Sequence, residues 1–138
     1  MAATCTVTQE TNQAKLKKGT MQRVRWQWKS HTDGSVSGVG GAAAITGRIH
    51  SARLLEATGI SSDGALPSSG YDLTLVDQYG LDYLGGLGAN IPNSNANALT
   101  NKLLINSMGA VVATSLAPVI ANAGDTKQGI IDLLYEVL

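Results

Sequence analysis

Residues 21–30 read MQRVRWQWKS, a stretch in which polar and apolar side chains alternate strictly from Arg23 to Lys29. Alternation at a period of two is typical of a β-strand with one buried face. Burial of Trp26 and Trp28 would remove about 150 to 250 Å² each from water, worth on the order of 4 to 6 kcal/mol apiece as an upper bound. No single charge pair on the other face would contribute as much free energy. The predicted core face is Val24, Trp26 and Trp28, and the predicted outward face is Arg23, Arg25, Gln27 and Lys29.

The same period continues downstream. Residues 42–58, AAAITGRIHSARLLEAT, predict a long strand with Ile45, Gly47 and Ile49 inward. The alternation slips near Ser51, so we expect a bulge there that returns Leu54 or Leu55 to the core face. Further on, YDLTLVDQYG (71–80) predicts a half-buried strand, and two apolar runs lie around residues 103–105 and 111–120. Pro118 is expected at a strand start or on a sheet edge because it cannot donate a ladder hydrogen bond.

Two turn signals predict hairpins. Asp33-Gly34 follows the tryptophan strand, and Gly124-Asp125 joins Val119 and Ile120 to IIDLLYEVL (130–138). In this last strand Ile131, Leu133, Tyr135 and Val137 share one face. The opposite face mixes acidic with aliphatic side chains, a composition that indicates cover by another subunit. Its members are Ile130, Asp132, Leu134, Glu136 and Leu138.

Many strands, frequent turns and no convincing amphipathic helix predict an all-β fold, namely a single antiparallel β-sandwich or a jelly-roll-like barrel. The 138 residues fit one domain. We expect the sandwich over residues 21–138, with residues 1–20 as an N-terminal arm or first strand. Within that part TCTVTQ (4–9) predicts either a strand of the sheet or an arm that becomes a strand on a partner.

Composition limits the classes of function. Only 14% of residues are charged, against the usual quarter or so, which suits either a protein packed against copies of itself or an ordinary small domain with a neutral surface. Cys5 is the only cysteine, so an internal disulfide, a paired zinc site and a CxxC redox motif are excluded. The polar start lacks the apolar core of a secretory signal, and the longest apolar run is interrupted. We therefore expect a soluble protein made in the cytoplasm, without a membrane partner.

Charge is distributed unevenly. Residues 1–30 hold six cations and one carboxylate, whereas residues 54–138 hold eight carboxylates and two cations. Either the basic part of one subunit docks on the acidic face of a neighbour or lattice, or the two parts are solvated faces that never meet. The candidate partner-binding residues are Lys15, Lys17, Lys18, Arg23, Arg25, Lys29, Asp132 and Glu136.

Candidates for chemistry are few. His31, His50 and Cys5 lie in no recognisable nucleophile motif, so we expect no enzyme, no cofactor and no substrate. Asp72, Asp77 and Asp82 recur five residues apart, but a calcium loop places its ligands at alternate positions, which leaves a metal here the weaker interpretation. Nucleic-acid binding through residues 15–29 is disfavoured, because the tryptophans and the cations of a strand lie on opposite sides.

Four segments carry a resemblance: WQWKSHTDGSVSG (26–38), ITGRIHSARLLEATG (45–59), YDLTLVDQYGLDYLGGLGAN (71–90) and NAGDTKQGIIDLLYEV (122–137). In this order they resemble small virion proteins of tailed bacteriophages, over about residues 22–138. The resemblance implies a non-enzymatic capsid cement or decoration protein, made in the host cytoplasm and bound in many copies to the major capsid protein lattice and to copies of itself. Asp132 and Glu136 depart from the expected pattern, since basic or neutral residues would be unsurprising there.

Two other functions stay open. A structural protein of the tail or head-to-tail junction would be present in about a dozen copies per particle, whereas a cement protein needs hundreds. A cellular binding module or small hydrolase would stay monomeric, and a hydrolase would respond to His50→Ala.

Overall fold

The computed structural model describes residues 3–9, 17–37, 41–55, 67–68, 70–91, 102–106 and 111–138. Side chains are described for all of these except Leu55 and residues 102–106. The strands are β1 (Thr4–Gln9), β2 (Met21–Lys29), β3 (Ala43–Leu55), β4 (Asp72–Val76), β5 (Lys102–Asn106), β6 (Val111–Ala121) and β7 (Gln128–Val137). The described residues contain no helix, which confirms the all-β class. Accordingly, no helix among them is long and apolar enough to cross a membrane.

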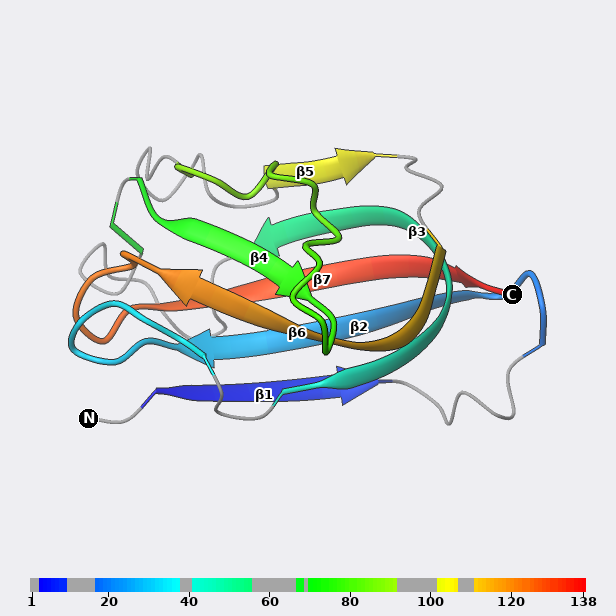
Figure 1. Ribbon diagram of the computed structural model, residues 1–138, viewed down its shortest axis with the longest axis horizontal. Helices are drawn as coiled ribbons and strands as arrows, with labels where there is room; N and C mark the ends of the chain where they lie inside the picture. Colours follow the sequence, from blue (N-terminus) through cyan, green and yellow to red (C-terminus); the bar gives the residue numbers. More distant parts are fainter. Residues whose placement is uncertain are drawn as a thin grey trace.

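All seven strands belong to one antiparallel sheet that curls into a half-barrel (Figure 1). Six strands follow the order β1-β2-β7-β3-β6-β4, and β5 pairs with β3 beside this path. Two long strands produce the curl because each changes its partner along its length. β3 pairs with β6 through Ala43–Arg48 and mainly with β7 and β5 beyond that point, while β6 leaves β3 after Leu116 and pairs with β4 from Ala117. As a result, β4 and β6 lie in front of β2 and β7 in Figure 1.

The core fills the space inside the curl. Val24, Trp26 and Trp28 are 0%, 0% and 3% exposed, which confirms the predicted core face of β2. Trp28 packs against Tyr71 beside β4, with ring centroids 6.3 Å apart, and so joins the two sides of the half-barrel. A Cβ atom at Gly129 would lie 2.7 Å from Cζ2 of Trp28, so the close approach of this ring to β7 requires glycine. The predicted inward residues of β3, β4 and β7 are also buried: Ile45, Gly47, Ile49, Tyr71, Leu73, Leu75, Ile131, Leu133, Tyr135 and Val137.

The predicted bulge in β3 is confirmed. The register of β3 against β7 shifts between Ile49 and Ser51, so His50 is the additional residue. An added residue reverses the side to which later side chains point. Ala52 and Leu54 consequently point into the core, where they are 0% and 4% exposed.

Both hairpin predictions are wrong. The turn at Asp33-Gly34 is present, but β2 pairs with β1 and β7 and does not pair with β3. Likewise β6 and β7 are separated by β3 in the sheet. The physical reason is that the two turns bond to each other: the Ala123 amide donates to the Gly34 carbonyl (3.0 Å) and the Ser30 amide donates to the Lys127 carbonyl (2.8 Å). The first turn also closes on itself, where the His31 amide donates to the Ser35 carbonyl (3.0 Å), but Val36 then pairs with Ile120, so neither turn joins two neighbouring strands.

Pro118 lies within β6, so of its two predicted places the strand start is wrong, whereas the place on an edge fits, because β6 pairs there with β4 only. It is aligned with Leu75 of β4, two residues after β6 has left β3. At that point the strand has no ladder on the β3 side, and the missing amide of proline therefore costs no hydrogen bond there.

Residues 4–9 form a strand of the same sheet, not an extension away from it. β1 pairs with β2 along its whole length, from Thr4 opposite Lys29 to Gln9 opposite Val24. Of the two alternatives for TCTVTQ, the structure therefore shows the first, a strand that pairs with β2 of the same chain. The candidate residue Lys15 lies outside the described residues.

Candidate interaction surface

The structure places most predicted site residues on one surface, which we call the outer face. It is the side of β1, β2, β7 and the second half of β3 that points away from the core. Alternation along these strands defines its members with described side chains, which are Thr4, Thr6, Thr8, Met21, Arg23, Arg25, Gln27, Lys29, Ser51, Arg53, Ile130, Asp132, Leu134 and Glu136. Cations outnumber carboxylates on the outer face. It holds four cations, Arg23, Arg25, Lys29 and Arg53, and two carboxylates, Asp132 and Glu136.

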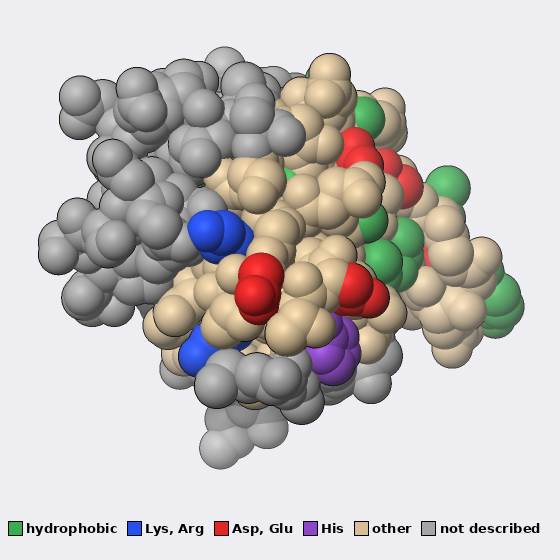
Figure 2. Space-filling view, turned by 90° about the vertical axis from the view of Figure 1, so that its left-hand side faces the viewer, with side chains coloured by type: hydrophobic (Ala, Val, Ile, Leu, Met, Phe, Trp, Pro, Cys, Tyr) green, Lys and Arg blue, Asp and Glu red, His purple; other side chains and the backbone are tan. Residues whose placement is uncertain are grey.

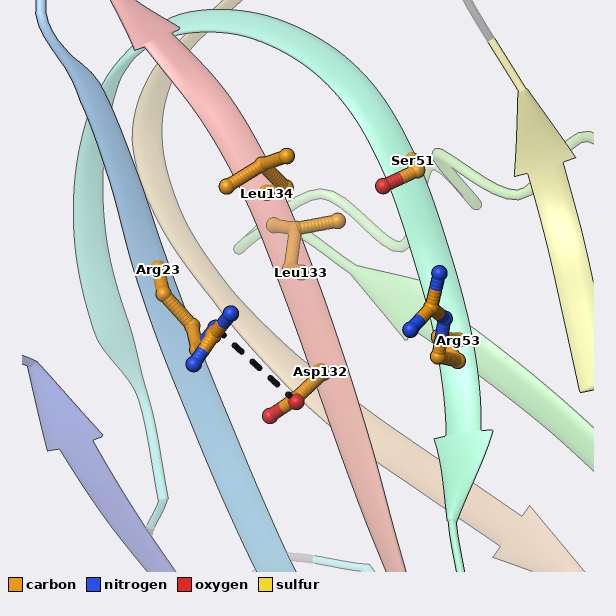
Figure 3. A pocket seen from close by; sticks show the side chains of 6 residues that line it. All are labelled: Arg23, Ser51, Arg53, Asp132, Leu133 and Leu134. Carbon is orange, nitrogen blue, oxygen red and sulfur yellow. Dashed lines mark ion pairs between the residues drawn. The ribbon is translucent and has the colours of Figure 1, made fainter. Parts of the chain in front are cut away.

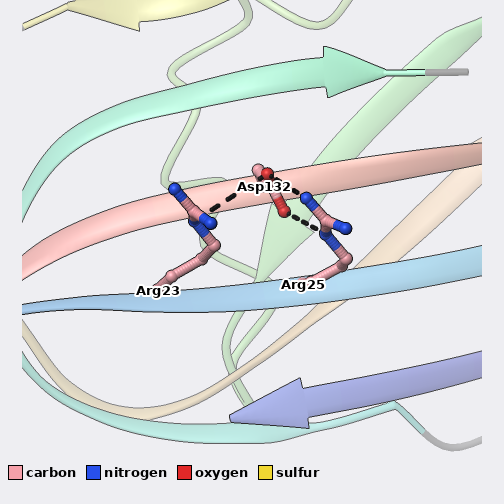
Figure 4. Close-up of polar contacts among 3 residues, drawn as sticks. All are labelled: Arg23, Arg25 and Asp132. Atoms are coloured by element: carbon pink, nitrogen blue, oxygen red, sulfur yellow. Dashed lines mark hydrogen bonds and ion pairs between the residues drawn. The ribbon is translucent and has the colours of Figure 1, made fainter. Parts of the chain in front are cut away.

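The outer face contains one well-formed ion pair. Arg25 and Asp132 are aligned across β2 and β7, and the guanidinium donates two hydrogen bonds to the carboxylate, Nε to Oδ1 at 2.7 Å and Nη2 to Oδ2 at 2.8 Å (Figure 4). These hydrogen bonds raise the pKa of Arg25. Arg23 is a weaker partner, with Nε 3.9 Å from Oδ2 of Asp132. The basic and acidic parts of the sequence thus meet within one chain here, which neither sequence interpretation anticipated.

A small pocket opens beside this pair (Figure 3). Its volume is about 80 Å³, and its lining residues are Arg23, Ser51, Arg53, Asp132, Leu133 and Leu134. Arg23 and Arg53 stand on the two sides of β7, with Asp132 between them. Since Arg25 already binds both oxygens of Asp132, the two flanking guanidinium groups keep donors for an incoming carboxylate or carbonyl oxygen.

The other candidate residues are spread around this centre. Lys17 and Lys18 are exposed in the segment before β2, and Lys29 ends that strand. Glu136 lies near the other end of β7, where Oε1 is 3.3 Å from Nε2 of His50. The expectation that another subunit covers the whole far face of β7 is wrong at Ile130, because this side chain is already 2% exposed within the chain.

Sequence reasoning missed Ser51 and Arg53 as members of the surface. Both lie on the outer face because the bulge at His50 resets the alternation of β3. The signal was present in the sequence: once Ala52 and Leu54 are assigned to the core, Ser51 and Arg53 must point outward. What the sequence did not reveal is that β7 brings them next to Asp132.

The residues considered for catalysis have structural contacts. Nδ1 of His31 accepts a hydrogen bond from the Ala3 amide at 3.0 Å. Cys5 lies in β1, and desolvation by burial raises the pKa of its thiol to about 11, so it is protonated at neutral pH. No arrangement of a nucleophile with a general base follows from these contacts.

The three regularly spaced aspartates serve as hydrogen-bond acceptors for the backbone. Asp72 accepts from the Asn90 amide (2.8 Å), and Asp77 accepts from the Tyr79 and Leu81 amides (2.9 and 3.1 Å). Asp82 accepts from the amides of Leu75, Leu84 and Gly86. In the described part of the chain no three His, Cys, Asp or Glu side chains are grouped so that they could hold a metal ion.

Comparison with known proteins found no matching family model, no matching curated protein and no matching solved structure.

Proposed function

We propose that this chain is a non-enzymatic virion structural protein of a tailed bacteriophage, a capsid cement or decoration protein that binds the coat lattice in many copies. The observation that carries the proposal is the outer face, a continuous four-stranded surface with an excess of cations and a pocket flanked by two arginines. A broad sheet face of this kind suits a protein surface better than a small substrate. Carboxylates of the coat lattice, or of a copy of this chain already bound to it, would bind the cations of this face.

The edge of β1 supports the same proposal. In the described residues β1 pairs only with β2, and its sequence TCTVTQ contains no charge and no proline. Exposed edges usually carry Lys, Pro or a bulge, which block pairing with another chain. An edge without these residues is suited to strand addition on a neighbour, whose backbone would complete its hydrogen bonds.

The proposal also includes two predictions about the fold, a β-sandwich or jelly-roll-like barrel and an N-terminal arm. Packing of Trp28 on Tyr71 across the half-barrel supports a β-sandwich or jelly-roll-like barrel. An N-terminal arm within residues 1–20 stays a prediction, because residues 10–16 lie outside the described residues.

Attachment to the particle tests the proposal. Arg23→Gln with Lys29→Gln removes two outer-face cations and leaves the Arg25–Asp132 pair intact, so we expect weaker attachment with an unchanged circular dichroism spectrum. A matched variant, Ala113→Glu with Ser115→Glu, makes the same change in net charge at exposed positions of β6 and should attach normally. Equal attachment of both variants at physiological salt would refute the role of the outer face.

Copy number tests the place in the particle. Quantitative mass spectrometry of purified virions should find hundreds of copies per particle. About a dozen copies would favour the tail or head-to-tail junction, and a chain missing from virions would exclude both.

A further inference from the structure

We infer that copies of this chain bind one another head to tail, with the loop of residues 77–91 of one copy docked on the Arg23–Arg53 pocket of the next. The inference rests on the part of the proposed function in which the protein contacts copies of itself. It does not depend on the virion. Two surfaces carry it: the loop, where Tyr79, Leu81 and Leu87 are exposed, and the part of the outer face around the exposed residues Arg23 and Arg53.

The loop of residues 77–91 displays hydrophobic side chains to solvent. Tyr79, Leu81 and Leu87 are 84%, 59% and 56% exposed. These are three of the six exposed large hydrophobic residues in the described part of the chain. Hydrophobic side chains stand out on the right of Figure 2, which corresponds to the front of Figure 1, where β4 and the segment that follows it lie. Exposed side chains of this size, gathered in one loop, are typical of a contact surface.

The loop is held in a defined conformation. Asp77 accepts hydrogen bonds from two amides of the loop, and Asp82 accepts from two loop amides and one amide of β4. Leu84 and Ile91 fix it from below, because each is 1% exposed. A loop that is already ordered loses little conformational entropy on binding, so its exposed side chains can contribute most of their burial to affinity.

Charge makes the loop complementary to the outer face. The loop of residues 77–91 contains Asp77 and Asp82 and no lysine or arginine. The pocket on the outer face is flanked by Arg23 and Arg53, and within the described residues Arg53 forms no ion pair. An acidic loop is drawn toward such a surface. The exposed ring of Tyr79 can then stack on a guanidinium group.

The two surfaces lie on opposite sides of the molecule. In Figure 1, β4 and the segment after it lie in front of β2 and β7, whereas in Figure 3, which looks onto the pocket, they lie behind. A contact between opposite sides cannot be a closed two-fold dimer, since a pair of copies keeps a free loop on one copy and a free pocket on the other. Repetition of this contact therefore gives a ring or a chain of copies.

Sedimentation velocity of the purified full-length chain tests the inference. The loop variant Tyr79→Ser with Leu81→Ser and the pocket variant Arg23→Gln with Arg53→Gln each remove one half of the contact. We expect concentration-dependent assemblies larger than a dimer for the wild type, weaker in high salt, and a loss of affinity of about tenfold or more in each variant. Circular dichroism and thermal melting serve as controls for folding.

A mixture of the two variants gives the decisive result. The loop variant keeps its pocket and the pocket variant keeps its loop, so an equimolar mixture should form a one-to-one dimer and nothing larger. A wild-type monomer at all concentrations, a wild-type assembly that stops at a closed dimer, or a mixture that stays monomeric would overturn the inference. The loop variant separates the two proposals, because it keeps every cation of the outer face: if it still attaches to particles, only the self-contact and not the proposed function depends on the loop. If attachment fails while wild-type chains form in solution, the proposed function fails and the inference stands.

Discussion

The residue with the most consequence on the outer face is Arg25, which holds Asp132 by two hydrogen bonds. The Asp132 side chain is only 13% exposed, so without Arg25 the nearest cation to this largely buried carboxylate among the described residues would be Arg23, 3.9 Å away. Leaving a buried charged group without its partner costs stability. We therefore assign Arg25 to the fold, and Arg23 and Arg53 to binding.

Arg25→Ala should accordingly lower the free energy of unfolding by about 1 to 2 kcal/mol, the lower part of the range for bonds to charged groups because Arg25 is partly exposed. Lys29→Ala, on the same face of the same strand, removes a cation that has no ion pair among the described residues. This variant should therefore change the free energy of unfolding by less than about 0.5 kcal/mol. Urea denaturation measures both. Equal effects would show that the bidentate pair adds nothing beyond its charge.

Cys5 provides a prediction about pH. Its pKa is about 11 in the folded protein because burial desolvates the thiolate, against about 8.5 in an unfolded chain. The folded value is the higher one, so the contribution to stability is complete below about pH 8.5 and is lost as the pH rises toward 11. The urea midpoint of the wild type should fall over this range relative to that of Cys5→Ala. Parallel pH profiles would contradict the raised pKa.

At the scale of elements, the segment after β4 depends on its carboxylates. Asp82 joins Leu75 of β4 to Leu84 and Gly86 of the loop through backbone amides at 3.1, 3.0 and 3.0 Å. Asp77 likewise accepts hydrogen bonds from backbone amides of the loop, those of Tyr79 and Leu81. Burial raises its pKa, but hydrogen bonds from the Leu81 and Tyr79 amides and from the Tyr83 hydroxyl together leave the pKa below its usual value. The loop therefore gains stability from ionised Asp77 above about pH 4 and loses it at lower pH.

Asp82→Ala should release the loop while the sheet remains. We expect faster amide hydrogen exchange at Leu84 and Gly86, and a loss of about 1 to 3 kcal/mol in the free energy of unfolding, because three amides lose their acceptor. Gln78→Ala in the same loop is the matched control, and exchange should be unchanged in it. Protection at residues 84 and 86 that survives Asp82→Ala would show that other contacts hold the loop.

Elements were predicted unequally well. The tryptophan strand, the bulge in β3 and the inward residues of β4 and β7 followed from alternation, because alternation reports which side of a strand is buried. The hairpins at Asp33-Gly34 and Gly124-Asp125 were wrong because a turn signal reports a local change of direction and not the partner of the next strand. Among the candidate site residues, Arg23, Arg25, Lys29 and Asp132 do share one surface, whereas their pairing across β2 and β7 was not predictable from spacing.

At the scale of the whole molecule, the sheet is built from segments far apart in the chain. β2 pairs with β7 from Met21 opposite Glu136 to Lys29 opposite Gln128, and β7 separates β2 from β3. Such pairing closes long loops before it gains contacts, which slows folding. The central position of β7 also makes the last ten or so residues indispensable to the sheet.

Refolding from urea should therefore take milliseconds to seconds, as measured by stopped-flow tryptophan fluorescence of Trp26 and Trp28. A chain that ends at residue 127 lacks β7 and should show neither the buried tryptophan emission nor a cooperative transition. A chain that begins at residue 17 lacks residues 1–16, and with them the edge strand β1, and serves as the control, which should still fold. Microsecond folding, or a cooperative transition without β7, would contradict this topology.

The sequence by itself determined that the chain is all-β, which side of most strands is buried and where β3 bulges, because these depend on hydrophobic burial along one strand at a time. Only the tertiary structure decided that β7 lies between β2 and β3, that β6 passes from β3 to β4, and that Asp132 lies between Arg23, Arg25 and Arg53. Those arrangements depend on which segments pack together across the molecule, a competition among long-range contacts that local patterns do not encode.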